Sequence, residues 1–151
     1  MGNRTDDVIA LTEVTNKYAR SIDEQDWDLF RTLFTDDCVV DYGIKPVVGC
    51  ESFLLMARRT CEALDATHHV FTNHLFEVED DRAAGRFSMT AQHIRRGAEG
   101  GSLYTLGGTY WDDFVRGPDG WRISKRVYRA TWGRGNAALL GNRFVCDDPV
   151  A

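Results

Sequence analysis

Helical spacing of apolar positions marks the first third of the chain. Apolar or small side chains recur every three or four residues over 8–22, which predicts one buried face of a long helix. We expect Thr5 or Asp6 to cap the start of this helix, and Asp26 to cap a second, shorter one. The same kind of spacing predicts a third helix over 53–64.

A two-residue alternation of apolar and polar positions follows in the rest of the chain. The expected strands are a short one at 38–42, before a turn region at 43–49, and four longer ones at 69–78, 83–95, 102–115 and 121–132. Glycine, proline and aspartate mark the turns between the long strands, and a polar, glycine-rich tail closes the chain. Helices followed by an antiparallel sheet indicate an α+β fold.

The alternation also assigns a face of the sheet to each strand residue. His93 falls in a row with Phe87 and Met89, whereas Arg129 falls in a row with Ile123 and Lys125. The outward row of the last strand is expected to hold Arg122, Ser124, Arg126 and Tyr128, with Trp132 beyond. Because a buried ionisable group is costly without a partner, an inward His and an inward Arg indicate a pocket with polar groups in its wall. The alternative for His93 is a hydrogen-bonded core histidine.

Composition and charge narrow the class of protein. The 151 residues are 43% hydrophobic and 27% charged, which fits one globular domain over 1–151. Residues 1–81 hold 17 acidic and 7 basic side chains, whereas residues 82–151 hold 6 and 11. We expect the two halves to attract each other or a neighbouring subunit, and the scattered arginines predict no nucleic-acid partner. No apolar run is long enough to span a membrane, and the N-terminus lacks the apolar core of a signal peptide, so we expect a cytoplasmic protein with no membrane partner.

Sequence motifs for metals and cofactors are missing. The histidines have no familiar metal-ligand spacing, and no glycine-rich phosphate loop is present. Four cysteines occur without a CxxC pair: Cys38, Cys50, Cys61 and Cys146. We expect them to be free, buried thiols. Any reaction is therefore expected to use side chains alone, with no metal and no organic cofactor.

Several short segments, taken in order, resemble a known family. They are Ser21-Ile22-Asp23-Glu24-Gln25-Asp26-Trp27-Asp28, Val40-Asp41-Tyr42, Thr67-His68-His69 and Gln92-His93. With the order of helices and strands, they resemble the nuclear transport factor 2-like superfamily, which includes ketosteroid isomerase and the SnoaL-like polyketide cyclases, and above all scytalone dehydratase. The resemblance spans about residues 10–135. It implies a cone-shaped (cystatin-like) fold, in which three helices pack on a curved mixed, mainly antiparallel sheet that encloses a pocket.

This chain also departs from scytalone dehydratase. Ile22 stands where that family has a second catalytic tyrosine, and Gly108 and Tyr110 stand where it has a serine and an asparagine. We therefore do not expect scytalone itself as the substrate. Other relatives supply part of the set, because Tyr18 with Asp23 resembles a pair in bile-acid dehydratase. The pairing of Asp and His is also similar to that of hexachlorocyclohexane dehydrochlorinase, and all these relatives perform eliminations.

The resemblance implies a catalytic role for six side chains: Asp23, His69, His93, Tyr42, Tyr18 and Arg129. Asp23 would fix the tautomer of His69, which would remove a proton next to a substrate carbonyl. The two tyrosines, and the arginine that falls near the catalytic arginine of bile-acid dehydratase, would hold the enolate oxygen. His93 would protonate the departing hydroxyl. The alternatives are that Asp23 only caps the second helix and that the tyrosines are core residues.

A pocket with an apolar and aromatic wall is expected beside these groups. Its predicted lining is Ile22, Phe53, Phe71, Phe87, Met89, Tyr110 and Trp132. Such a lining favours a flat, ring-containing substrate. We predict a cofactor-independent lyase that dehydrates a hydroxylated cyclic ketone, polyketide or steroid-like small molecule. The alternatives are an isomerase or cyclase that uses the same proton abstraction, or a non-catalytic small-molecule-binding module. A homo-oligomer is expected, with a trimer favoured over a dimer.

Overall fold

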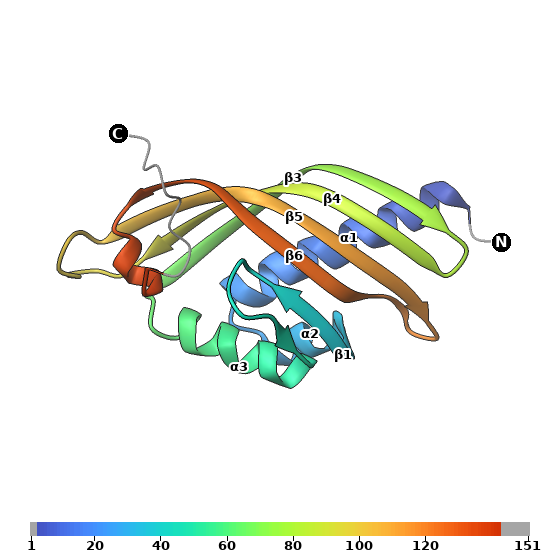
Figure 1. Ribbon diagram of the computed structural model, residues 1–151, viewed down its shortest axis with the longest axis horizontal. Helices are drawn as coiled ribbons and strands as arrows, with labels where there is room; N and C mark the ends of the chain where they lie inside the picture. Colours follow the sequence, from blue (N-terminus) through green and yellow to red (C-terminus); the bar gives the residue numbers. More distant parts are fainter. Residues whose placement is uncertain (1–2, 143–151) are drawn as a thin grey trace.

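The computed structural model describes residues 3–142, in which three α-helices lie against one six-stranded sheet (Figure 1). The helices are α1 (Arg4–Asp23), α2 (Trp27–Thr32) and α3 (Cys50–Cys61), with a 3-10 helix, η1 (Ala137–Leu140), after the sheet. The strands are β1 (Phe34–Asp41), β2 (Val47–Val48), β3 (Ala66–Glu79), β4 (Arg82–Ile94), β5 (Leu103–Gly117) and β6 (Gly120–Gly135). The predicted α+β class is confirmed.

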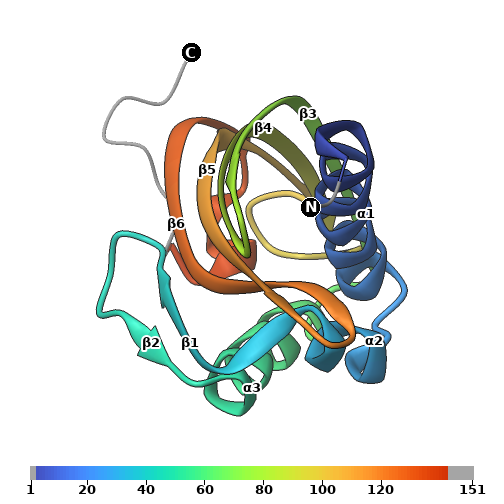
Figure 2. The ribbon, with the colours of Figure 1, turned by 90° about the vertical axis from the view of Figure 1, so that its right-hand side faces the viewer.

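The six strands form one mixed sheet in the order β2-β1-β6-β5-β4-β3. β1 runs parallel to β6, and every other neighbouring pair is antiparallel. The sheet curves around α1, which packs against β3, while α2 and α3 pack near β1 (Figure 2). This is the cone-shaped arrangement that the resemblance implies, with its concave face turned toward the helices.

Local signals explain where the helices begin. The Asn3 side chain caps α1 by accepting a hydrogen bond from the backbone nitrogen of Thr5 at 3.1 Å, so the cap lies before the two predicted residues. Asp26 caps α2 as predicted and accepts from the backbone nitrogen of Leu29 at 2.9 Å. β2 and η1 were not predicted, because two and four residues are too few to show a periodic pattern.

A one-residue bulge interrupts the pairing of β5 with β6. Asp113 pairs with Lys125, but Phe114 pairs with Ile123, so Ser124 has no cross-strand partner of its own. Because side chains alternate along a strand, one inserted residue moves every later side chain to the opposite face. The predicted faces therefore hold before the bulge and are reversed after it, as far as a second register shift at Thr131.

The reversal corrects four predictions for β6. Arg126 and Tyr128, expected on the outer face, are buried. Lys125 and Arg129, expected to point inward, are exposed. The Arg129 guanidinium donates to the Asp41 carboxylate at 2.8 Å, at the surface of the molecule.

An irregularity in β3 brings His74 to the interior. The register with β4 shifts between Thr72 and Leu75, and Asn73 has a left-handed backbone φ of 58°. His74 forms a hydrogen bond with the Thr15 hydroxyl at 3.0 Å and so connects β3 to α1. Bulges of this kind bend a strand, which suits a sheet that must curve around a helix.

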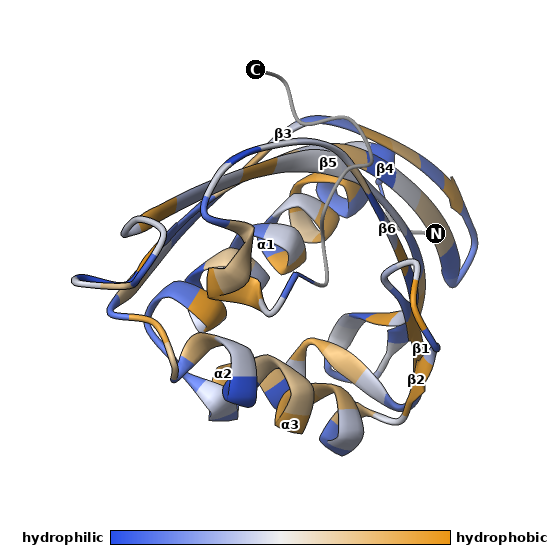
Figure 3. Cartoon of the chain, turned by 60° about the vertical axis from the view of Figure 1, so that its left-hand side comes forward, coloured by the Kyte–Doolittle hydropathy of each residue, from blue (hydrophilic) through white to orange (hydrophobic). Residues whose placement is uncertain are grey.

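Apolar and polar residues alternate along the helices and strands, as the sequence pattern requires (Figure 3). Phe30, Phe34 and Phe53 join α2, β1 and α3, with ring centroids 5.0–5.2 Å apart. All three side chains are buried and belong to one apolar cluster. Packed aromatic rings of this size bury a large apolar area and hold the helices in place.

Ion pairs connect the acidic first half of the chain to the basic second half. Asp7 pairs with Arg116 at 2.7 Å, and Asp41 pairs with Arg129 at 2.8 Å. The Trp121 indole nitrogen also donates to Asp7 at 3.3 Å. The predicted attraction between the two halves is therefore present within the fold.

Three cysteine thiols are buried and free, as expected: Cys38, Cys50 and Cys61. The expectation for Cys146 lies outside the described residues. Within residues 3–142, no helix is long and apolar enough to cross a membrane. The cytoplasmic location stays a prediction of the sequence.

Candidate active site

A carboxylate and a histidine meet where α1 ends and β3 begins. Asp23 is the last residue of α1. Its Oδ1 accepts hydrogen bonds from Nδ1 of His69 at 2.7 Å and from the Thr67 hydroxyl at 2.8 Å. Its Oδ2 accepts from the backbone nitrogen of His69 at 2.8 Å. Three donors thus fix the carboxylate, and the structure places Asp23 and His69 at the distance that the resemblance implies.

This arrangement decides which nitrogen of His69 is available for chemistry. Burial alone would raise the pKa of Asp23, but the hydrogen bonds and charge of His69, together with the Thr67 hydroxyl, outweigh burial and lower that pKa. The ionised carboxylate accepts the Nδ1 proton, so Nε2 of the neutral ring keeps its lone pair. Because His69 lines the cavity described below, this nitrogen is the candidate base.

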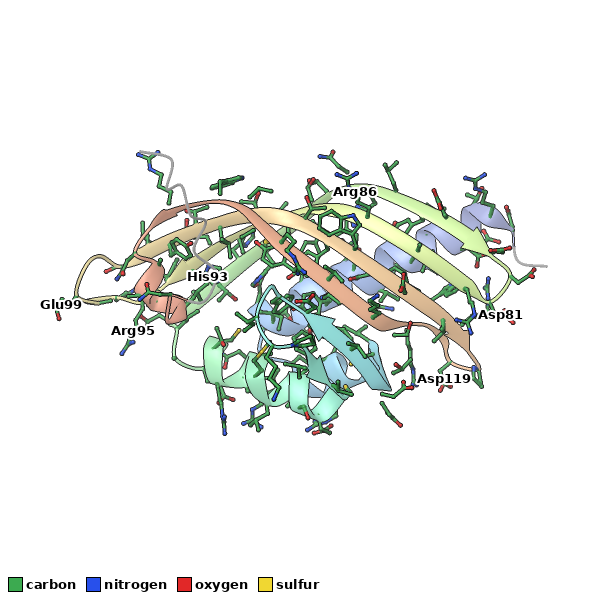
Figure 4. All side chains as sticks on the ribbon, viewed as in Figure 1. Asp81, Arg86, His93, Arg95, Glu99 and Asp119 are labelled. Atoms are coloured by element: carbon green, nitrogen blue, oxygen red, sulfur yellow. The ribbon has the colours of Figure 1, made fainter. Side chains whose placement is uncertain are left out.

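His93 lies on β4 next to His69, with ring centroids 5.8 Å apart and ring planes at 88°. Its Nδ1 donates to the backbone carbonyl oxygen of Tyr104 at 3.2 Å, because a carbonyl oxygen can only accept. Burial, helped by the nearby His69, lowers the pKa of His93 to about 4. Figure 4 places His93 on the inner side of the sheet, whereas Arg86 projects from the outer side. A neutral His93 does not fit its predicted role as the proton donor to a departing hydroxyl.

Three tyrosine hydroxyls form a chain across the concave face. The Tyr42 hydroxyl lies 3.1 Å from the Tyr18 hydroxyl and 3.5 Å from the Tyr110 hydroxyl. Burial is the largest cause that holds the pKa of all three well above the ordinary value. The hydroxyls therefore stay protonated and can donate hydrogen bonds to a substrate oxygen.

A buried ion pair lies behind these tyrosines. Arg126 donates to both carboxylate oxygens of Asp112, at 2.9 and 2.6 Å, and both side chains are fully buried. Burial opposes the charge of Arg126, but Asp112 outweighs it and holds the pKa of the guanidinium above its ordinary value. The guanidinium carbon lies 4.0 Å from the ring centroid of Tyr18 and 4.5 Å from that of Tyr110. Among the described residues, none accepts a hydrogen bond from Arg126 Nη1.

The sequence prediction missed this pair, although a signal for it was present. Asp112 stands in the inward row of β5 between Tyr110 and Phe114, and a carboxylate in such a row needs a cation. The turn that joins β5 to β6 brings Lys125 and Arg126 to that position, so a basic residue facing inward could have been inferred.

These groups surround a cavity of about 70 Å³. Its wall includes eight residues with a predicted catalytic or lining role: Tyr18, Ile22, Tyr42, Phe53, His69, Met89, His93 and Tyr110. It also includes several that were not predicted, among them Met56, Cys61, Tyr128 and Leu140. The two unbranched methionine side chains in the wall can adapt to a guest larger than the present cavity.

Three predicted lining residues lie elsewhere. Phe71 packs against Tyr18 with nearly parallel rings, at a centroid distance of 5.9 Å. Phe87 packs against Tyr110 at 5.5 Å. Trp132 follows a second register shift in β6, and its indole covers Gly107 on the outer face of the sheet.

Arg129 also lies away from the cavity, so its catalytic assignment is corrected. Its side chain is 47% exposed and is bound to Asp41. The bulge at Ser124 places Arg126, three residues earlier, in the interior instead.

A larger hollow of about 570 Å³ lies near the turn between β3 and β4. Its polar lining includes Glu77, Glu79, Arg82, Asp113 and Ser124. It contains no histidine or tyrosine, so we assign the candidate site to the smaller cavity, where acid–base groups meet. Within residues 3–142, no three His, Cys, Asp or Glu side chains come together as ligands for a metal ion.

Comparison with known proteins identifies the family. The model of the SnoaL-like domain family matches residues 3–127, which is most of the chain. The chain belongs to the SnoaL-like domain family. The predicted membership of the nuclear transport factor 2-like superfamily is thereby confirmed. This SnoaL-like chain is also 26% identical over 138 residues to Terrestric acid biosynthesis cluster protein E of Penicillium crustosum, which covers 87% of this chain and 88% of that protein.

Solved structures share the fold of this SnoaL-like protein. The Kfla4162 protein of Kribbella flavida superposes with a TM-score of 0.85 at 27% identity, over 91% of this chain and 99% of that one. A Novosphingobium aromaticivorans protein, provisionally named a scytalone dehydratase, gives a TM-score of 0.78 at 22% identity, over 85% and 87%. Family and fold together support an enzyme of the nuclear transport factor 2-like class that converts a small molecule.

Proposed function

We propose that this SnoaL-like protein is a cofactor-independent dehydratase, which removes water from a hydroxylated cyclic ketone, polyketide or steroid-like small molecule. The observation that carries the proposal is the pair formed by Asp23 and His69, whose Oδ1 and Nδ1 lie 2.7 Å apart at the edge of an apolar cavity. A histidine oriented by a carboxylate is an effective general base near neutral pH.

The proposed reaction begins with proton removal. Nε2 of His69 takes the proton from the carbon next to the substrate carbonyl, and the electron pair of that C–H bond forms an enolate. When the carbonyl re-forms, a C=C bond is made and the C–O bond at the β-carbon breaks. The imidazolium, held by Asp23, returns its proton to the departing hydroxide, which leaves as water. His69 ends in its starting state, so the reaction balances without an external acid.

The tyrosine hydroxyls supply the groups for the enolate oxygen. A donor placed where negative charge develops stabilises the transition state more than the ground state. Tyr18 and Tyr110 also lie against the Arg126 guanidinium, at 4.0 and 4.5 Å from their ring centroids. Asp112 offsets the charge of this guanidinium, which therefore serves mainly to hold the two rings in place.

The wall of the cavity and two relatives support this class of substrate. Ile22, Phe53 and Leu106 make the wall apolar, which suits a hydrocarbon ring. One solved relative is provisionally named a scytalone dehydratase, and a curated relative is named for a biosynthesis cluster. Both names fit a small organic substrate.

Turnover of β-hydroxy cyclic ketones tests the proposal. The protein is incubated with 3-hydroxycyclohexanone and with 3-hydroxy-1-tetralone, and product is followed by absorbance and by mass. Loss of one water supports the dehydratase. An unchanged mass with a moved double bond indicates an isomerase, and saturable binding without turnover indicates a binding module. Equal turnover by His69→Ala and the natural protein would reject His69 as the base.

We also propose that the protein forms a homo-oligomer, with a trimer favoured over a dimer. The outer face of the sheet carries exposed apolar side chains, including Val70 at 43%, Leu75 at 71% and Trp111 at 40% exposure. Leu75 and Trp111 flank Arg86 on neighbouring strands, so they form one continuous patch. Such a patch is typical of a surface that a partner covers. Sedimentation as a single 17.1 kDa species would reject the association.

A further inference from the structure

The two histidines at the cavity hold their protons in different ways. Nδ1 of His69 donates to the Asp23 carboxylate, a charged partner that fixes the orientation of the ring. Nδ1 of His93 donates to the neutral backbone carbonyl of Tyr104 at 3.2 Å. The histidine on β3 can therefore act as a base, whereas the one on β4 lacks that support.

The remaining nitrogen of His93 is an acceptor. Because Nδ1 carries the proton of the neutral ring, Nε2 carries a lone pair. His93 lines the cavity with only 6% of its surface exposed, and no described residue donates a hydrogen bond to Nε2. Inside a largely apolar cavity, a ligand that supplies a donor to this nitrogen gains affinity.

We infer that His93 determines substrate specificity by accepting a hydrogen bond from a hydroxyl that the substrate keeps through the reaction. The inference rests on the proposed dehydration and refines its substrate class. A departing hydroxyl must gain a proton, and an acceptor placed on its hydrogen would oppose departure. The hydroxyl bound to Nε2 is therefore a second one, and the substrate is a cyclic ketone with one hydroxyl that leaves and one that stays.

The two histidines share one stretch of the cavity wall. Their ring centroids are 5.8 Å apart in an edge-to-face arrangement, so a bound molecule contacts both rings from the cavity side. The neighbouring wall includes Met89 and Leu106, which offer no strong donor to replace a missing hydroxyl. A substrate analogue without the hydroxyl thus leaves Nε2 unpaired in an apolar site, and sites of this kind discriminate strongly against such analogues.

Binding of two matched probes tests the role of His93. The probes are 4-hydroxycyclohexanone and 4-methoxycyclohexanone, which differ by one methyl group and have no β-hydroxyl to eliminate. Dissociation constants are measured by NMR titration at pH 7. We expect the natural protein to bind the hydroxyl probe at least about tenfold more tightly, the effect of one hydrogen bond to a buried acceptor. His93→Gln, whose amide oxygen can accept at a similar reach, should keep part of this ratio.

His93→Phe removes the acceptor and keeps the ring volume, so the ratio should fall to about one. If the His93→Phe variant does not fold, the His93→Leu variant is used in its place. The control is His74→Phe, a half-buried histidine outside the cavity wall, which should leave the ratio unchanged. Equal affinity of the natural protein for both probes, or an unchanged ratio in the His93→Phe or His93→Leu variant, overturns the inference.

The outcome stays distinct from that of the proposed function, because the probe titration involves no turnover. A hydroxyl preference lost with His93, in a protein that dehydrates no ketone of the panel, retains the role of His93 and rejects the dehydratase. If the natural protein dehydrates 3-hydroxycyclohexanone but binds both probes equally, the dehydratase is retained and the role of His93 is rejected.

Discussion

Two carboxylates near the cavity, Asp23 on α1 and Asp112 on β5, pair with basic side chains, and the pairs differ in what they can do with a proton. Asp23 meets His69 at the edge of the cavity, where side-chain exposure is 20% and 10%. Asp112 meets Arg126 where neither side chain is exposed. An imidazole binds and releases a proton near neutral pH, whereas a guanidinium stays protonated. Similar hydrogen-bond distances therefore give a proton carrier in one place and a fixed charge in the other.

The comparison separates function from stability. Damage to the first pair should appear mainly in turnover, because His69 has a water-accessible cavity on its other side. Damage to the second pair should appear mainly in the free energy of unfolding, because a lone charge would remain buried. Four measurements, taken in order of expected effect, test this separation.

The largest effect is expected for His69→Ala. Turnover of a β-hydroxy cyclic ketone should fall about 10²–10⁴-fold, the usual contribution of a positioned general base. The matched control is His68→Ala, because His68 is exposed and points away from His69 along β3. The initial rates of the two variants and of the natural protein are compared. If His68→Ala loses as much activity as His69→Ala, the effect is structural and the assigned base is wrong.

The second effect is expected for Arg126→Met. This change leaves Asp112 buried without its partner, and the free energy of unfolding should fall by about 3–5 kcal/mol. The double variant Arg126→Met with Asp112→Leu removes both charges and should be more stable than the single variant. Urea unfolding at pH 7 measures both. A single variant as stable as the natural protein would show that the pair does not hold this part of the fold.

The third effect is the loss of stability in acid caused by His93. Its pKa is about 4 in the fold against an ordinary value of 6.5, so between these pH values the unfolded chain binds a proton that the folded protein does not. The free energy of unfolding should therefore fall by up to about 3 kcal/mol as the pH drops from 6.5 to 4. In the His93→Gln variant, this part of the fall in the free energy of unfolding should be absent. Urea unfolding over pH 4–7 compares the two slopes, and identical slopes would contradict the low pKa.

The smallest effect is expected for Arg129→Ala. Arg129 is half-exposed and pairs with Asp41 at the surface, so its loss should change the free energy of unfolding by no more than about 1 kcal/mol. Turnover should be unchanged, in contrast to the loss in His69→Ala. A hundredfold loss of turnover in Arg129→Ala would return this residue to the catalytic machinery.

Periodicity was enough to predict the main elements of the fold. The helical pattern over 8–22 and the alternating pattern after residue 66 both come from residues that pack on one face, and the structure confirms the α+β order. The acidic residue at the end of α1 and the histidine on β3 were placed by resemblance, and they lie 2.7 Å apart. The prediction of such a pair does not depend on exact element boundaries, because Asp23 stays at the end of the helix and His69 stays near the start of the strand when a boundary moves by one or two residues.

The errors fall where the chain departs from regular alternation. Trp121 and Ile123 are inward as predicted, but Ser124 adds one residue, and no local hydrophobic pattern announces it. His74 also faces α1 only because the register shifts at the left-handed Asn73, since regular alternation from His69 would place it on the other face. Long-range pairing with the neighbouring strand fixes these irregularities, so a reading of one strand by itself cannot find them.

The bulge at Ser124 acts on β6 as a frameshift acts on a coding sequence. Side chains before it keep their expected face, and those between it and the second shift at Thr131 lie on the opposite face. Two arginines three residues apart, Arg126 and Arg129, exchange interior and surface roles through that one residue. A lineage could therefore change the charge buried behind its cavity by gaining or losing one residue in β6, with no substitution in the cavity wall.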